Sequence, residues 1–183
     1  MLNKENILAK LISYVFHPLL LPTMGLFLLF NMDETGLWVP SSEMQLSLIA
    51  LTFTATFVLP LLNALILLKM KQIDSLSMET RQERKIPYLV TSIFYFTESY
   101  LLMNADVPVL VKALMFGSTL LVVSVLLINL FWKISAHMVG IGGLCGVMIA
   151  ISARLQIELH ILLIALFLIA GVVAFARLKL KAH

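Results

Sequence analysis

Three polar segments, far apart in the sequence, carry the residue types that could do chemistry. They lie at residues 78–87 (METRQERKIP), 133–137 (KISAH) and 177–183 (RLKLKAH). Guanidinium and ammonium groups bind anions, and imidazole takes up and releases protons near neutral pH. If the fold brings these segments together, they form a site for an anion with acid–base groups beside it. The candidate site residues are Arg81, Arg84, Lys133, Ser135, His137, Arg177 and His183.

The rest of the chain must place these segments within a membrane protein. Of the 183 residues, 61% are hydrophobic and only 13% are charged, and the mean hydropathy is +1.01. A soluble domain has about 45–50% apolar and about 25% charged residues. Too little polar surface is present to cover a water-soluble protein of this size, so we expect an integral membrane protein.

Long apolar runs predict an all-α, polytopic transmembrane bundle of about six helices, forming a single domain over residues 1–183. The runs at residues 45–68 and 113–132 contain no Asp, Glu, Lys or Arg. His17 and Pro18 interrupt the first run, which predicts a kinked or partly re-entrant span, and Pro60 predicts a kink in the second. The expected spans are residues 11–32, 45–68, 87–104, 113–132, 134–153 and 159–176.

Antiparallel spans joined in this order put all three polar segments on the side of the N-terminus. That side carries every lysine and arginine of the chain except Lys112 and Arg154. Loops rich in Lys and Arg face the cytoplasm. We therefore expect an inner-membrane or plasma-membrane protein whose N-terminus and basic loops are cytoplasmic.

At these segments the sequence resembles the type 2 phosphatidic acid phosphatase superfamily, whose signatures read K-x6-R-P, P-S-G-H and S-R-x5-H-x3-D. Residues 134–137, ISAH, are similar to the second signature, and residues 176–183 are similar to the third, with the spacing from Arg177 to His183 intact. Arg81, Arg84 and Pro87 approximate the first signature.

The resemblance is partial. Ile134, Ala136 and Ala176 stand where the family has Pro, Gly and Ser, and no Lys precedes an Arg-Pro pair at the first signature. The Asp of the third signature would fall beyond His183, the last residue given. We therefore expect either a longer natural chain or a member without this acid.

The resemblance implies a membrane enzyme that hydrolyses a lipid phosphomonoester without a metal or other cofactor. His183 would attack phosphorus to form a phosphohistidine, and His137 would protonate the leaving alkoxide. Phosphate-binding groups would come from the remaining candidates, which are Arg81, Arg84, Lys133, Ser135 and Arg177. The expected partners are the lipid phosphate substrate and the bilayer.

The residues also leave other functions open. A non-catalytic membrane protein, either a carrier for a lipid or small solute or a scaffold, would use the basic side only to fix its orientation. Glu98 inside the third span would then be the functional candidate, because a carboxyl group in a bilayer is used or paired. His17 could line a pocket or simply mark a helix break. A bis-histidine metal or haem site is disfavoured by the spacing of the histidines. No nucleic-acid signature is present, and the oligomeric state is open.

Overall fold

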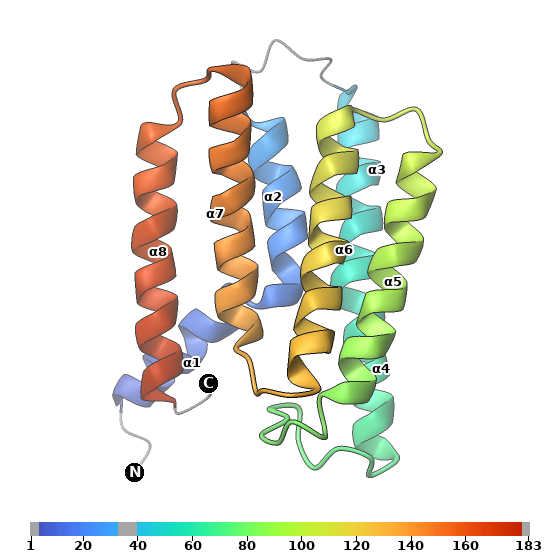
Figure 1. Cartoon of the computed structure of the whole chain (residues 1–183), viewed down its shortest axis with the longest axis vertical. Helices are drawn as coiled ribbons and strands as arrows, with labels where there is room; N and C mark the ends of the chain where they lie inside the picture. Colours follow the sequence, from blue (N-terminus) through green and yellow to red (C-terminus); the bar gives the residue numbers. More distant parts are fainter. Residues whose placement is uncertain (1–3, 33–39, 181–183) are drawn as a thin grey trace. The chain divides into compact units, whose positions relative to one another are not determined.

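The computed structural model describes residues 4–32 and 40–180, and every regular element in these ranges is a helix (Figure 1). The expected fold class, an all-α membrane bundle, is confirmed. Five helical stretches of the described residues are long and apolar enough to cross a membrane. They are Asn6–Phe30, Ser42–Lys69, Val109–Asn129, Ala136–Leu155 and His160–Lys179. The helix at Lys85–Met103, which matches the third expected span, is not among them.

The chain divides into two compact units, and the first combines residues 1–21 with residues 135–183. In this unit α1 contacts α8, α8 contacts α7, and α7 contacts the short helix η1. Sequence-distant helices therefore meet within one unit, where α7 and α8 run antiparallel (Figure 1). Its elements are α1 (Lys4–Val15), η1 (Pro18–Leu20), α7 (Ala136–Leu155) and α8 (His160–Lys179).

The first expected span is interrupted where the sequence indicated. Helix α1 ends at Val15, and His17 adopts an extended backbone as the N-cap of η1, with Pro18 as the first helical residue. Proline favours this first position because the missing N–H would have no partner in the helix anyway. The Nδ1 atom of His17 accepts a hydrogen bond from the backbone N–H of Leu19 at 3.4 Å, which caps the new helix.

Helix α1 buries small residues and exposes large apolar ones. Ala9 and Ser13 are buried, one turn apart, whereas five large apolar residues are exposed together with Asn6 and Lys10. This arrangement is the reverse of that in a soluble protein, and it suits a helix whose outer face contacts lipid. The exposed apolar residues are Ile7, Leu8, Leu11, Tyr14 and Val15.

The second unit covers residues 22–134 and takes α2 from its second residue on. Its closest helix pairs are α5 with α6 and α4 with α5. The short loop at residues 104–108 joins α5 to α6, whereas a long polar loop at residues 70–84 joins α4 to α5. Its elements are α2 (Leu21–Phe30), α3 (Ser42–Phe53), η2 (Thr54–Val58), α4 (Leu59–Lys69), α5 (Lys85–Met103) and α6 (Val109–Asn129).

A wide helical turn lies next to the proline that predicted a kink. The segment η2 between α3 and α4 is a π-helix, in which the N–H of Leu59 reaches the carbonyl of Thr54, five residues earlier. Pro60 follows at once and has no N–H to donate. The side chain of Thr56 supplies an extra donor, since its Oγ1 binds the carbonyl of Thr52 at 2.8 Å. A side-chain donor is thus added inside the irregular turn, where membrane hydrocarbon would offer none.

Polar side chains of this unit gather around Glu98 of α5, which is 2% exposed. The Oγ1 atom of Thr52 donates to Oε1 of Glu98 at 2.5 Å, and the hydroxyl of Tyr95 pairs with the side chain of Thr56. On the other side, Oγ1 of Thr119 in α6 shares its hydrogen between the carbonyls of Met115 at 2.9 Å and Tyr95 at 3.1 Å. These bonds join α3, η2, α5 and α6, so Glu98 takes part in helix packing.

Removing the hydroxyl of Thr52 should therefore weaken this unit. In Thr52→Val the carboxyl of Glu98 loses its donor while the volume of residue 52 hardly changes, and we expect a loss of about 1 kcal/mol, a typical value for an interhelical hydrogen bond in a membrane. Thr52→Ser keeps the hydroxyl and serves as the control. Thermal unfolding in detergent micelles measures both variants, and equal melting temperatures for Val and Ser would contradict the role given to this bond.

Candidate functional site

The structure assigns the expected site residues to both units. Ser135, His137 and Arg177 belong to the first unit, and Arg81, Arg84 and Lys133 belong to the second. His183 lies outside the described residues. Each group is described within its own unit.

Ser13 of α1 is the meeting point of the first group. The Nε2 atom of His137 lies 3.1 Å from the backbone carbonyl oxygen of Ser13, and Nη1 of Arg177 donates to the Oγ of Ser13 at 3.4 Å. The Ser13 hydroxyl in turn donates to the carbonyl of Ala9 at 3.0 Å. One buried serine thus holds an imidazole from α7 and a guanidinium from α8. The expected proximity of the second and third polar segments is present in this arrangement.

The imidazole of His17 joins the same cluster. Its ring centre lies 5.5 Å from that of His137, and the two rings meet edge to face at 76°. When Nε2 of a neutral His137 donates to the Ser13 carbonyl, Nδ1 is the proton acceptor of that ring. His17 therefore lies at the break between α1 and η1 and contacts a predicted site residue, while its role in lining a pocket stays a prediction.

A close helix approach places His137 beside η1. Gly140 lies one turn after His137 in α7, and a Cβ atom at this position would come within 2.6 Å of Leu21 Cδ1 and 3.4 Å of Pro18 Cβ. At Gly142 and Gly146, by contrast, an added Cβ would meet nothing within 4 Å among the described residues. Of these glycines, Gly140 is the one whose missing side chain allows the contact.

Ser135 occupies the N-cap of α7, but its hydroxyl does not cap the helix. Its backbone carbonyl accepts from the N–H groups of Met138 and Val139, both at 3.1 Å. The Oγ atom is buried and has no hydrogen-bond partner among the described residues. A serine N-cap normally accepts a bond from the second or third N–H of its helix. Here a buried hydroxyl and the positive end of a 20-residue helix lie next to each other.

The arginines of the second unit bind backbone carbonyls. Arg84 is 6% exposed, and it donates from Nε to Met78 O at 2.7 Å and from Nη1 to Ile134 O at 3.1 Å. Arg81 donates from Nη1 to Phe131 O at 2.6 Å. The 70–84 loop is thereby attached to the segment that follows α6. These contacts give both arginines a structural role, and their expected binding of phosphate stays a prediction.

Two further side chains complete this attachment. The Nδ2 atom of Asn129, the last residue of α6, donates to the carbonyl of Arg81 at 3.1 Å. Within the loop, Oγ1 of Thr80 donates to Oε1 of Glu83 at 2.5 Å. This hydrogen bond, with smaller contributions from backbone donors and from Arg84, holds the pKa of Glu83 below its usual value. Lys133 is half-buried in the segment between α6 and α7.

The sequence did not indicate Ser13, the residue that His137 and Arg177 share. A signal was present, since Ala9 and Ser13 are small residues one helical turn apart in a segment of large apolar ones. In the described part of the chain, no group of three His, Cys, Asp or Glu side chains has an arrangement that could hold a metal ion.

The arginine contacts predict a structural effect of Arg84→Gln. The carbonyls of Met78 and Ile134 lose charged donors in a buried place, so we expect a loss of about 1–3 kcal/mol and faster amide hydrogen exchange across residues 70–84. Lys71→Gln removes an exposed charge from the same loop and should leave exchange unchanged. Unaltered exchange in Arg84→Gln would argue against the structural role.

The close approach at Gly140 predicts a position-specific steric effect. Gly140→Val should push α7 away from Pro18 and Leu21 and cost about 1–3 kcal/mol, as over-packing typically does. Gly142→Val adds the same side chain in open space and is the matched control. Melting temperatures in detergent distinguish the two, and equal values would show that the approach is not tight.

Comparison with known proteins assigns the chain to no family. No protein-family model matches the chain, and neither a curated protein nor a solved structure is similar to it. Its function is therefore argued from the side chains around Ser13 and at the start of α7.

Proposed function

We propose that the chain is an integral-membrane phosphatase that hydrolyses a lipid phosphomonoester through a phosphohistidine. The observation that carries this proposal is the meeting of His137 and Arg177 at Ser13, together with the unpartnered hydroxyl of Ser135, two residues before His137 at the start of α7. This arrangement combines a proton donor, a permanent cation, a hydroxyl and a helix N-terminus in one unit.

Each of these groups matches a need of phosphoryl transfer. The three equatorial oxygens of the transferring group carry negative charge, which fixed cations and N–H donors stabilise without reorganisation. Arg177 supplies the cation, while the N-terminus of α7 and the Ser135 hydroxyl supply donors. The resemblance of residues 176–183 to the family signature adds His183 as the nucleophile.

The reaction then has two balanced steps. A histidine nitrogen of His183 attacks phosphorus, the bond from phosphorus to the ester oxygen breaks, and protonated His137 gives its proton to the leaving alkoxide. In the second step neutral His137 takes a proton from water, the resulting hydroxide attacks phosphorus, and the bond from phosphorus to the His183 nitrogen breaks to release inorganic phosphate. His137 ends protonated and His183 ends free, so neither step needs an oxidant or a metal.

The membrane explains why such a site would be built from transmembrane helices. The substrate class is a phosphate on an apolar tail, and the charged group must be bound at the membrane boundary while the tail stays in hydrocarbon. Arg177 lies in the last turn of α8, and Ser135 directly precedes α7. Both therefore lie at helix ends, where a charged headgroup can be reached.

Phosphate release from phosphatidic acid in mixed micelles tests this function. Purified full-length protein should release phosphate, and His137→Ala should lower kcat by about 10²–10⁴-fold, the range expected for loss of a general acid. Ser135→Ala should weaken turnover less, since it removes one neutral donor. His160→Ala is the matched control, because His160 is an exposed histidine at the first residue of α8.

Trapping of the intermediate adds a second measurement. Quenching in alkaline detergent after a pulse of labelled substrate should reveal a base-stable phosphoprotein that is lost on acid treatment and is absent in His183→Ala. Equal phosphate release by wild type and His137→Ala, with both proteins folded, would contradict the proposed phosphatase activity and favour a carrier or scaffold.

A further inference from the structure

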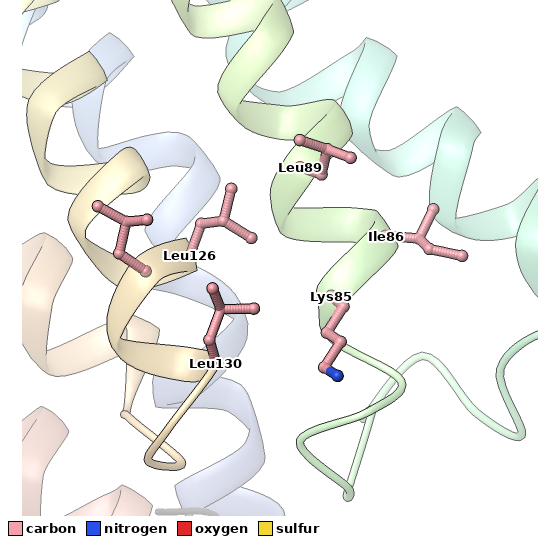
Figure 2. Close-up of a pocket in the computed structure, with 6 residues that line it drawn as sticks. Lys85, Ile86, Leu89, Leu126 and Leu130 are labelled. Carbon is pink, nitrogen blue, oxygen red and sulfur yellow. The ribbon is translucent and has the colours of Figure 1, made fainter.

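A groove lies between the start of α5 and the end of α6 in the second unit (Figure 2). It encloses about 290 Å³. We call it the α5–α6 groove. It is lined by Lys85, Ile86, Leu89, Leu126, Leu127 and Leu130.

The groove faces outward, since several of its apolar side chains are exposed. Leu89 is 50% exposed and Leu127 is 54% exposed. Pockets for small polar molecules contain several convergent polar groups that orient the ligand. Apart from Lys85, the side chains lining this groove are aliphatic, so they match a hydrocarbon chain better than a polar solute.

The position of Lys85 adds a charge at one end of this apolar lining. Lys85 is the first residue of α5, and Leu89 follows one turn later, about 6 Å further along the helix axis. A lysine at such a position can keep its methylene groups against apolar neighbours while its ammonium group extends to the headgroup level of a membrane.

The electrostatic field at this end favours an anion. The N-terminus of a helix carries a partial positive charge, and a lysine there adds to that charge. The first turn of α5, KIPY, contains no acidic residue to compensate, and the carboxyl group nearest to it in the sequence, that of Glu83, accepts a hydrogen bond from Thr80. A negatively charged group placed beside Lys85 would be stabilised by both the side chain and the helix.

We propose that the α5–α6 groove binds an anionic phospholipid of the surrounding membrane. One acyl chain lies against Leu89, Leu126 and Leu130, and the phosphate pairs with Lys85. None of the residues lining the groove belongs to the cluster around Ser13, so this lipid is a bound companion of the protein. The proposal is independent of the phosphatase reaction.

Photo-crosslinking in lipid nanodiscs tests the proposal. Full-length protein is reconstituted with phosphatidylglycerol or phosphatidylcholine whose acyl chain carries a diazirine near the headgroup, and labelled peptides are identified by mass spectrometry. We expect adducts in residues 85–89 and 126–130, with phosphatidylglycerol favoured about fivefold. This is the factor for one lysine contributing about 1 kcal/mol to an anionic lipid.

Three variants separate charge from shape. Lys85→Gln should reduce labelling by phosphatidylglycerol to the level of phosphatidylcholine. Lys69→Gln, which removes an exposed charge at the end of α4, should keep the preference. Leu126→Trp should fill the groove and lower labelling by both probes. Size-exclusion chromatography identifies the folded fraction of each variant.

Several results would overturn the proposal. Equal labelling by the two lipids in wild type would show non-selective contact with hydrocarbon. A preference that persists in Lys85→Gln would place the anion elsewhere. An absence of adducts from both segments would show that a different occupant, such as a second copy of the chain, covers the groove. Since no outcome depends on turnover, the test is separate from that of the phosphatase.

Discussion

Every backbone N–H and C=O group that this chain places in hydrocarbon needs a partner inside the protein, because the bilayer core offers no water. Regular helices meet this demand through their own backbone. The difficulty arises where the helices break, and there side chains supply what the backbone lacks. His17 caps η1, Thr56 binds a carbonyl at the wide turn, and Arg84 binds the carbonyls of Met78 and Ile134.

This requirement changes how the candidate site is interpreted. Arg84 looks like an anion-binding residue in the sequence, yet its guanidinium serves two backbone carbonyls. Ser135 behaves in the opposite way, because a residue type that usually caps a helix has an uncommitted hydroxyl. Ser135, His137 and Arg177 are therefore better candidates for a chemical role than Arg84. The role of His183 follows only from the resemblance, and that of Lys133 only from its expected position at the membrane boundary.

Much of the fold could be predicted because long charge-free runs have few alternatives to transmembrane helices. The break at His17 and Pro18 was also readable, since proline cannot continue the preceding helix. The contact of His137 and Arg177 with Ser13 could not be predicted, because both residues lie more than a hundred positions from Ser13 in the sequence. The carbonyl partners of Arg84 were hidden for a related reason: backbone acceptors exist at every residue, so no sequence letter marks them.

The wide turn Thr54–Val58 accommodates about one extra residue compared with an α-helical turn. Each helical residue rotates the following side chains by about 100° around the axis. A chain lacking one residue here would therefore turn Thr52 away from Glu98 while the contacts of α4 stayed in place. The number of residues in this turn thus sets the rotation of the α3 side chains relative to those of α4. An insertion or deletion there would change this rotation even if every side chain of α3 and α4 were kept.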